Sequence, residues 1–478
     1  MNARGGSDLM SIIFKTFRTY AHPYVYDRHT NAVVMLTEDE YKELVDVEKG
    51  KMVEEDSAVL KKYQKEGLFH PNTVQHIEHP GTDIIEQYLK TRLKQLTLQV
   101  TQQCNLRCAY CAYSGIYNNS RTHANAVMSF DVAKKAIDFF LERNNELSKV
   151  VIGFYGGEPL LEFDLIKHCV EYSKSKVEGK EIRFNMTTNG TLLTDKVVDF
   201  LVENDFTLAI SLDGSKEEHD VNRKFINGQG SFDIIMKNIK RLKERYPKYG
   251  EEIMFLTTIN PYMDVGCTLE YFKMSDVFND RQIIFNTMKE VSLSNSISYD
   301  KKYFMIRNLE RIKLLFWLIG KLEKKYVSPL MIRSKESIEK KAVSFREHIV
   351  LPEMAHHGGP CMPGVHRLFV RVDGTLFPCE KVSEGLDYFK IGTLDHGFDI
   401  VNIKRMLNIG QVTESNCKTC WNLRQCSLCS AQIDFDSILT KDRKLTECSK
   451  CVNNVLFELY ELCVLKEFGY DEEEMRID

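Results

Sequence analysis

Long hydrophobic runs are missing from this sequence. The most apolar stretch, Leu314 to Ile319, is far too short to cross a bilayer, and the opening residues MNARGGSDLMSIIFKTFR lack the apolar core of a signal peptide. We therefore expect a cytoplasmic protein with no membrane partner.

An excess of one charge is missing as well, since 64 basic against 68 acidic residues leave a net charge of -4. This balance gives no electrostatic case for binding nucleic acid.

Cysteine, in contrast, is abundant. The chain has 14 cysteines, and most of them fall into tight spacings. In a reducing compartment such clusters bind metal or perform redox chemistry more often than they form disulfides. The length of 478 residues and the 43% hydrophobic content predict a globular protein of several domains. Iron or zinc binding is therefore the first question that the sequence raises.

From Leu96 onward, buried-looking strands alternate with amphipathic helices, a pattern typical of βα units on a parallel sheet. Cap residues precede three of the helices: Ser129, Thr194 and Ser231. The sequence thus predicts an α/β fold with a partial, open (β/α)6 TIM-like barrel. The six predicted strands span 96–100, 150–155, 182–188, 207–212, 253–259 and 282–287.

The regions outside the barrel have different patterns. Residues 12–36 alternate apolar and polar side chains, which predicts short antiparallel strands. A capping box, Thr37 with Glu40, then starts a helix, and a second helix ends at Gly67. A helix-rich stretch covers about 301–347, and a terminal helix is predicted at 452–467.

The first cysteine cluster is the loop TQQCNLRCAYCAY, which follows the first barrel strand. Its CxxxCxxC spacing puts Cys104, Cys108 and Cys111 at the end of the strand where α/β enzymes carry their chemistry. Three thiolates on a 4Fe–4S cluster leave one iron open to an external ligand. The alternative, a structural zinc site, needs a fourth ligand, for which His123 is the candidate in this loop.

The CxxxCxYC motif, followed by Gly156-Gly157-Glu158-Pro159 after the second strand, resembles the radical S-adenosylmethionine (SAM) superfamily over about residues 94–300. The resemblance implies that the three cysteines hold a 4Fe–4S cluster and that Tyr110 packs near the SAM adenine. It also implies that the GGEP residues receive the SAM amino group. A glycine pair permits close backbone approach, and Glu158 matches an ammonium.

Further cofactor contacts are implied by the ends of the next strands. Thr188 and Asn189, and then Ser211 and Asp213, resemble the residues that bind the ribose in similar enzymes. Their alternative role is that of ordinary helix caps and turns. Arg223, in the segment HDVNR, could pair with the SAM carboxylate as a bidentate donor, or it could be a solvated surface arginine.

A second group of cysteines, in the C-terminal quarter of the chain, has the spacings Cx12Gx4C and CxxCx5CxxC and ends with CxxC. This pattern resembles a SPASM domain, which carries two auxiliary 4Fe–4S clusters. A zinc ribbon is the alternative, but five residues between two CxxC pairs is a short separation for one. The resemblance implies Cys361, Cys379 and Cys429 as ligands of auxiliary cluster one, and Cys417, Cys420, Cys426 and Cys448 as ligands of auxiliary cluster two.

The pattern departs from that of fully ligated relatives such as anaerobic sulfatase maturases. Those relatives carry another cysteine soon after the first and end with CxxxC. Here cluster one could keep an open iron that binds a substrate thiolate, or Cys451 could complete it. Cys169, Cys267 and Cys463 are interpreted as buried hydrophobic residues.

The N-terminal module resembles the precursor-peptide recognition element of peptide-modifying enzymes, a winged-helix-like fold. We expect an exposed strand, IIFKTF or AVVML, to pair with a leader peptide, although the module could instead only cap the barrel. The predicted domains are a recognition domain (1–90), a radical SAM barrel (91–300), a helical bridge (301–350) and a SPASM domain (351–478).

This layout resembles that of thioether-forming maturases of ranthipeptides and sactipeptides. The hypothesis is that a 5′-deoxyadenosyl radical takes hydrogen from a carbon of a cysteine-rich precursor peptide. A cysteine sulfur then bonds to that carbon, and the electron released enters the auxiliary clusters. A flavodoxin or ferredoxin would supply the first electron.

Two other functions stay open. The same radical could form a carbon–carbon crosslink, epimerise a residue, or oxidise a seryl or cysteinyl residue of a sulfatase to formylglycine. Alternatively, the chain could be a metal-containing protein that only binds peptides.

Overall fold

The computed structural model describes residues 11–177, 179–279, 282–288, 293, 298–345, 349–433 and 435–470. Its centre is a ten-stranded sheet with the strand order β10-β9-β8-β7-β6-β5-β12-β13-β14-β15. The six strands from β5 to β10 are parallel, as the sequence pattern predicts. Their bounds are β5 Gln95–Thr101, β6 Lys149–Gly156, β7 Glu181–Thr188, β8 Phe206–Ser211, β9 Met254–Ile259 and β10 Ile283–Thr287.

The barrel strands are apolar because each is covered by helices and by its neighbours. Phe154, Phe184 and Phe206 stack on three adjacent strands in the core. Ser129 and Thr194 cap their helices, as predicted. Ser231 does not, because its hydroxyl donates instead to the carbonyl oxygen of Arg223. The helices between the strands are α4 Phe130–Leu141, α5 Phe163–Lys176, α6 Asp195–Glu203, α7 Lys216–Asn222, α8 Phe232–Arg245, α9 Pro247–Glu252 and α10 Val265–Met274.

The sheet continues into the C-terminal segment. Strand β12, Leu368–Val370, pairs in parallel with β5, although more than 260 residues separate them in the chain. The short strands β13 Thr375–Phe377, β14 Gly392–Thr393 and β15 Gly397–Phe398 follow in antiparallel pairing. The barrel and the C-terminal segment therefore share one sheet and one hydrophobic core.

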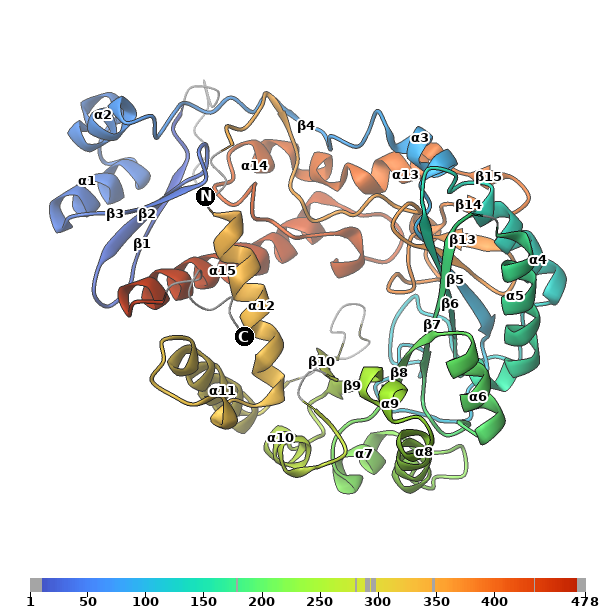
Figure 1. The fold of residues 1–478 in the computed structure, drawn as a ribbon. Helices are drawn as coiled ribbons and strands as arrows, with labels where there is room; N and C mark the ends of the chain where they lie inside the picture. The colour runs from blue at the N-terminus through green and yellow to red at the C-terminus, as the bar shows by residue number, and fades with distance from the viewer. Residues whose placement is uncertain are drawn as a thin grey trace.

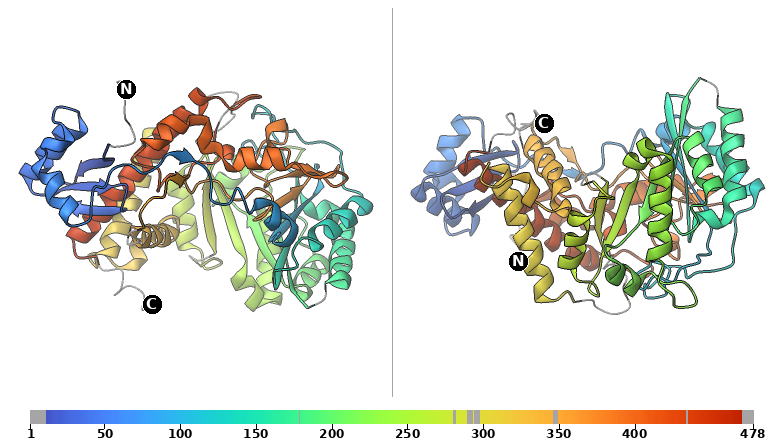
Figure 2. Two further views of the ribbon diagram at one scale, coloured as in Figure 1. Left: turned by 90° about the horizontal axis from the view of Figure 1, so that it is seen from above. Right: turned by 60° about the horizontal axis from the view of Figure 1, so that its bottom comes forward.

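The N-terminal module is a three-stranded antiparallel sheet covered on one face by two helices. The strands are β1 Phe14–Arg18, β2 Pro23–Asp27 and β3 Ala32–Met35, and the helices are α1 Glu38–Glu48 and α2 Ala58–Lys65. The capping box of Thr37 and Glu40 forms as predicted. Phe17, Tyr24 and Tyr26 on the other face pack against the last helix, α15 Lys441–Glu467. Figures 1 and 2 show this module beside α15, with the barrel on the far side of that helix.

Helix α15 begins well before the predicted start at 452. Thr440 caps it by accepting a hydrogen bond from the Arg443 N–H, and the charged stretch that follows leaves only a weak helical pattern in the sequence. The helix thereby carries Lys444, Cys448 and Cys451. Cys169 and Cys463 are buried as predicted, but Cys267 is exposed, because it lies in the first turn of α10.

The remaining elements connect these parts. The two-stranded parallel pair β4–β11 joins the segment after the N-terminal module to the start of the C-terminal segment. The bounds of this pair and of the other connecting elements are β4 His76–Ile77, β11 Met354–Ala355, α3 Ile85–Thr91, α11 Lys301–Leu318, α12 Pro329–Ser344, α13 Ile400–Leu407 and α14 Glu414–Lys418. The short 3₁₀ helices are η1 Glu54–Asp56, η2 Pro159–Glu162, η3 Lys324–Tyr326, η4 Asp387–Phe389, η5 Ile409–Thr413 and η6 Ser430–Gln432.

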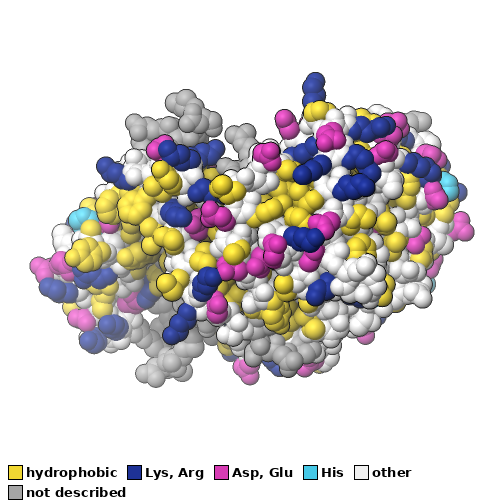
Figure 3. Space-filling view, turned by 90° about the horizontal axis from the view of Figure 1, so that it is seen from below, with side chains coloured by type: hydrophobic (Ala, Val, Ile, Leu, Met, Phe, Trp, Pro, Cys, Tyr) yellow, Lys and Arg dark blue, Asp and Glu magenta, His cyan; other side chains and the backbone are white. Residues whose placement is uncertain are grey.

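In the part of the chain that the structure describes, none of the helices combines the length and apolar character that a bilayer crossing demands. The face seen from below carries basic and acidic side chains interspersed with apolar ones (Figure 3). That mixture agrees with the balanced composition of the chain.

Candidate functional site: two fields of cysteine

The first site is the loop that follows β5. Cys104, Cys108 and Cys111 all lie on it, and N–H groups donate to two of the sulfurs: Leu106 N–H to Cys104 Sγ (3.4 Å) and Tyr113 N–H to Cys111 Sγ (3.5 Å). Such N–H donors stabilise thiolates that ligate metal. The backbone of the loop is fixed from the far side by Lys224 and Asn222, whose carbonyl oxygens accept hydrogen bonds from Arg107 and Ala109.

Burial decides the protonation of these three thiols. It raises the pKa of Cys104 to about 11 and that of Cys108 to about 12, and it raises the pKa of Cys111 as well. Without the influence of a metal, these thiols are therefore protonated at neutral pH. A metal ligand must be a thiolate, so that metal binding here would release protons.

The Gly156-Gly157 turn lies directly against the start of the cysteine loop. The N–H groups of Gly157 and Glu158 donate to the carbonyl oxygens of Thr101 and Gln103. A Cβ on Gly157 would lie 1.9 Å from the Gln103 carbonyl oxygen, and one on Gly156 would lie 2.2 Å from that of Thr101. The glycine pair is therefore needed to bring the second strand's loop onto the residues just before Cys104.

Glu158 is a buried carboxylate that joins the ends of β6 and β7. Its Oε1 accepts from the Leu160 N–H (3.1 Å) and the Thr188 hydroxyl (2.7 Å), and its Oε2 accepts from the Asn189 N–H (2.7 Å). Burial raises its pKa to about 7 although these hydrogen bonds favour the charged form. The interactions with SAM that the sequence implies for Glu158, Thr188 and Asn189 stay predictions.

Asn189 also touches the cysteine loop. Its side-chain amide donates to Asn105 Oδ1 (2.8 Å) and lies 3.9 Å from Cys104 Sγ. The end of β7 is thereby tied to the first metal-ligand candidate. Ser211 lies at the end of the next strand, β8.

Arg223, Asp213 and Tyr110 form one buried network. The Arg223 Nε donates to Asp213 Oδ2 (2.8 Å), and the Tyr110 hydroxyl donates to the same oxygen. Burial works against the charge on Arg223, but the adjacent Asp213 carboxylate raises its pKa well above the usual value. Arg223 is thus not the solvated surface residue that was the alternative. If Arg223 also pairs with the SAM carboxylate, as predicted, it must do so while it stays bonded to Asp213.

His219 is a further residue of this network, which the sequence did not single out. It accepts a hydrogen bond from the Asp213 N–H at Nδ1 (3.3 Å), and its Nε2 lies 2.9 Å from the Ser231 hydroxyl. Burial lowers its pKa to about 3, so the ring is neutral and fixes the turn that follows β8. The only sequence signal was its place in HDVNR.

The second field of cysteines separates into two groups. The Cys361 set comprises Cys361, Cys379 and Cys429, which interact electrostatically with one another. The Cys417 set comprises Cys417, Cys420, Cys426, Cys448 and Cys451, with the sulfurs of Cys426 and Cys451 3.6 Å apart. Cys451 therefore lies with the Cys417 set, and not in the gap that it was suggested to fill at cluster one.

Backbone N–H groups also face the sulfurs of the second field. At Cys379, Cys420, Cys426 and Cys429 they come from residues two or three positions beyond the cysteine. Burial raises the pKa of Tyr155, at the end of β6, and negative charge on Glu380 or Cys111 raises it further. Glu380 follows Cys379 directly, and its Oε2 is buried without a partner among the described residues. It is a candidate site residue that the cysteine spacing did not reveal.

The donor sets fit iron–sulfur clusters better than single ions. In the described ranges, no three His, Cys, Asp or Glu side chains converge closely enough for one metal ion. A tetrahedral zinc with bonds of about 2.3 Å needs its sulfurs within about 4 Å of one another. A four-iron cluster separates its cysteines more widely, and both fields offer cysteine alone.

Comparison with known proteins identifies the class. Residues 98–264 match the family model described as the Radical SAM superfamily. This range holds all three cysteines of the first loop and the GGEP turn. The chain therefore contains a radical SAM domain and is an enzyme, which excludes the reading as a protein that only binds peptides.

The relatives with a stated function include anaerobic sulfatase-maturating enzymes. The cysteine-type anaerobic sulfatase-maturating enzyme of Clostridium novyi is 26% identical over 344 residues, which are 69% of this chain and 85% of that enzyme. Uncharacterized protein MJ0907 of Methanocaldococcus jannaschii is 34% identical over 197 residues, 41% of this chain and 63% of that protein. The structure of native anSMEcpe with bound AdoMet and Kp18Cys peptide has a TM-score of 0.54 and 22% identity, and the match covers 77% of this chain and 99% of that one. This last likeness shows a shared fold.

We predict that Gly157→Ala abolishes iron binding at the first loop, because the new methyl group meets the Gln103 carbonyl oxygen at 1.9 Å. Gly358→Ala is the matched control, since no atom lies within 4 Å of its added Cβ. Iron analysis after anaerobic reconstitution should show the loss of about four irons in the first variant and none in the control. Full iron content in Gly157→Ala would contradict the close-approach explanation.

We predict that Asp213→Asn destabilises the protein by about 3–5 kcal/mol, because it leaves the buried Arg223 without its counter-charge. Asp199→Asn removes the half-buried partner of the exposed Arg245, an ion pair that is far more open to solvent, and should change stability much less. Anaerobic denaturant unfolding of the two variants measures the difference. Equal stabilities would show that Arg223 is not held by Asp213.

Proposed function

We propose that this protein is a radical SAM enzyme that forms cysteine sulfur-to-carbon thioether crosslinks in a ribosomally made precursor peptide. The observation that carries the proposal is the first loop, where three half-buried cysteines, two of them with N–H donors, lie against the Gly156–Glu158 turn. Cys104, Cys108 and Cys111 would hold a 4Fe–4S cluster there. Tyr110, Glu158 and the strand ends around Asn189 and Asp213 would surround the SAM. When bound, these groups supply a 5′-deoxyadenosyl radical, which takes one hydrogen atom from the substrate.

The chain's own residues account for what the site must do around that radical. The hydrogen-bonded turn of Glu158, Thr188 and Asn189 fixes the rim of the barrel next to Cys104. The ion pair of Arg223 and Asp213 is buried, so water does not compete for its hydrogen bonds. Each of the two side chains therefore keeps its orientation. Pre-oriented groups need no rearrangement during the reaction.

The second field supports a role beyond hydrogen abstraction. Making a C–S bond from C–H and S–H removes two hydrogens. One leaves as a hydrogen atom, and the other leaves as a proton and an electron. That electron needs an acceptor, and auxiliary clusters on the Cys361 and Cys417 sets would provide it. The Cys361 set has only three members among the described residues, which favours an open iron able to bind a substrate thiolate.

Glu380 is suitably sited to handle the proton of such a thiol. It directly follows Cys379, and its Oε1 pairs with Arg367 while Oε2 has no partner in the described part of the chain. An acceptor oxygen buried without a donor is costly, which favours a substrate group as the missing partner.

The second candidate is another modification by the same radical, in particular the oxidation of a sulfatase residue. The similarity to the Clostridium novyi enzyme favours it, since that relative is a sulfatase-maturating enzyme. The Cys361 set has three cysteines and the Cys417 set has five. Three ligands would leave an open iron for a substrate thiolate, which favours the thioether-forming function. A cytoplasmic location and a flavodoxin or ferredoxin as electron donor remain part of the proposal.

The leader of the precursor peptide would bind along β3. At the other edge of the module, β1 is partly covered, since the Thr16 N–H donates to Glu48 Oε2 (3.0 Å). The pairing pattern, with the Leu36 N–H bonded to Pro23, directs the N–H groups of Val33 and Met35 away from β2. Within the described part of the chain these groups have no partner. Of the two strands suggested by the sequence, AVVML therefore has the free edge.

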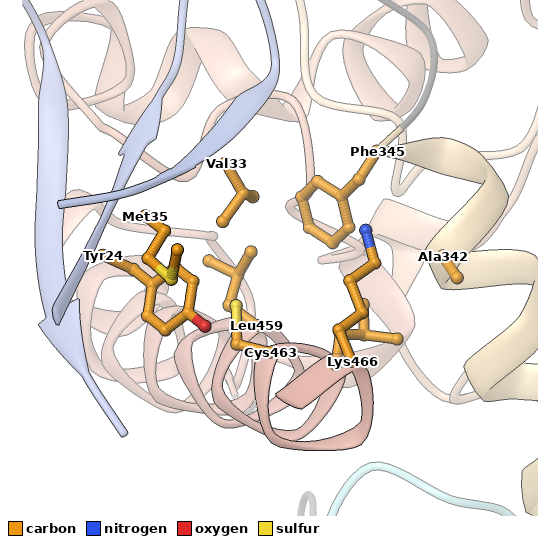
Figure 4. Close-up of a pocket in the computed structure, with 9 residues that line it drawn as sticks. Tyr24, Val33, Met35, Ala342, Phe345, Leu459, Cys463 and Lys466 are labelled. Carbon is orange, nitrogen blue, oxygen red and sulfur yellow. The ribbon is translucent and has the colours of Figure 1, made fainter. Parts of the chain in front are cut away.

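A cavity of about 360 Å³ adjoins that edge. Val33 and Met35 of β3 line one side of it (Figure 4). The other lining residues include Ala342 of α12, Phe345 just after that helix, and Leu459 of α15. Lys466 stands at the cavity without an ion pair among the described residues. A peptide strand added to β3 would place apolar side chains into the cavity and an acidic one near Lys466.

Anaerobic co-expression with a cysteine-rich peptide encoded beside the gene, followed by mass spectrometry, tests the function. Thioether formation removes two hydrogens per crosslink and protects the cysteines from alkylation. SAM cleavage with an unchanged peptide would contradict this substrate class, and formylglycine in a co-expressed sulfatase would establish the second candidate.

We predict that the reconstituted protein holds about twelve irons, and that Cys379→Ser lowers this to about eight while SAM cleavage persists. Cys267→Ser, at an exposed cysteine outside both fields, should leave the iron content unchanged. Iron and sulfide analysis with electron paramagnetic resonance (EPR) measures this. About four irons in the unmodified protein would rule out auxiliary clusters.

We predict that Met35→Pro weakens binding of the precursor peptide at least tenfold, because proline removes an outward N–H from the β3 edge. Met35→Thr keeps that N–H and is the matched control. Fluorescence anisotropy with the labelled leader measures affinity, and peptide-independent SAM cleavage should stay unchanged in both variants. Equal affinities would show that the leader does not pair with β3.

A further inference from the structure

Two cations are buried beside the Cys417 set without a carboxylate partner. Lys444 of α15 is 1% exposed, and its Nζ donates to the Thr413 hydroxyl (2.6 Å) and lies 3.6 Å from Cys417 Sγ. Arg28, at the turn between β2 and β3, is also 1% exposed. In the part of the chain that the structure describes, neither side chain forms an ion pair.

Arg28 is bonded to the segment that joins two cysteines of the set. Its Nη1 donates to the carbonyl oxygen of Lys418 (2.7 Å) and lies 3.5 Å from that of Cys420. Its Nη2 donates to Asn72, while its Nε is buried with no partner among the described residues. The neighbouring Asp27 is not available, because its carboxylate accepts from the N–H groups of His29 and Phe69 and from the Thr30 hydroxyl.

Lysine and arginine are almost never fully buried unless they are paired. Removing a cation from water is costly, and a hydroxyl or a carbonyl oxygen repays only part of that cost. Two such cations at one cysteine set therefore indicate an anion between them. The histidines near Lys444, His356 and His357, add no negative charge.

The anion that fits is the cluster itself. Four thiolates on a 4Fe–4S core give a net negative charge, and reduction makes it more negative. Nearby cations stabilise the reduced form more than the oxidised one.

We propose that Lys444 and Arg28 are the counter-charges of a 4Fe–4S cluster on the Cys417 set and raise its reduction potential. The inference rests on the auxiliary cluster of the proposed function. The two residues act through the cluster and are therefore positioning residues. A higher potential makes this cluster the better electron acceptor after the C–S bond closes.

The second consequence is a physical link between the N-terminal module and the cluster. The turn that carries Arg28 is held by the cysteine segment itself, since Arg424 donates to the carbonyl oxygens of Arg28 (2.9 Å) and His29 (2.7 Å). Gln425 donates to Asn31 Oδ1 (2.9 Å) in the same contact. The module that would hold the leader peptide is thus docked on the loop that ligates the cluster. Loss of the cluster should loosen this turn.

The test uses the anaerobically reconstituted full-length enzyme and an EPR-monitored redox titration. In Lys444→Met we expect unchanged iron content and a reduction equilibrium constant of one auxiliary cluster lowered at least tenfold, which corresponds to about 59 mV for one electron. Lys441→Met, an exposed lysine one turn earlier on α15, should leave every potential unchanged, because solvent and salt screen its charge. Full iron content with unchanged potentials in Lys444→Met would overturn the proposal.

Lys444→Arg keeps the positive charge. It therefore distinguishes an effect of the lost charge from a general disruption of the site. Loss of iron in Lys444→Met that Lys444→Arg restores supports the counter-charge, whereas equal loss in both variants overturns it. About four irons in the unmodified enzyme would instead remove the auxiliary clusters, and with them the proposed function on which this inference rests.

Hydrogen exchange tests the link to the N-terminal module. Cys420→Ser, which removes a ligand of the Cys417 set, should speed exchange in residues 27–31. Cys379→Ser, which affects the Cys361 set, should not. Unchanged exchange in Cys420→Ser would show that the module docks independently of the cluster.

Discussion

The parallel pairing of β12 with β5 is the contact on which the arrangement of the two cysteine fields depends. Leu96 and Leu98 of β5 lie opposite Leu368 and Val370 of β12, and all four side chains are fully buried. Strand β5 leads into the first cysteine loop, while β12 and β13 lie between Cys361 and Cys379. Because these strands share one sheet, the second field is fixed relative to the first without a flexible linker.

Desolvation is the second constraint. Most cysteines of the two fields are half-buried or buried, so a charged sulfur there would need compensation from N–H donors and cations that the fold supplies locally. At the first loop this comes mainly from backbone N–H groups that the loop conformation itself directs at the sulfurs. At the Cys417 set it also comes from Lys444 and Arg28, which belong to opposite ends of the chain. The N-terminal module is therefore part of the surroundings of the second field and not a separate attachment.

Local patterns were read correctly where neighbouring residues decide the structure. The six parallel strands, the capping box at Thr37 and the caps at Ser129 and Thr194 follow from periodicity and from short-range hydrogen bonds. The start of α15 was placed too late, because its first turns carry charged residues and cysteines whose burial only the tertiary contacts explain. Cys267 was expected to be buried, but it lies on the outer side of α10.

The sequence by itself determined which residues can carry the chemistry, because cysteine spacing and the Gly-Gly-Glu-Pro turn are local features of the chain. It also determined the parallel sheet, through the alternation of apolar strands and capped helices. Only the tertiary structure decided that Cys451 lies with Cys426, that Arg223 is paired with Asp213, and that β3 has a free edge among the described residues. The reason is physical: these contacts join residues that are distant in sequence, and their energies come from burial and charge pairing that no local pattern records.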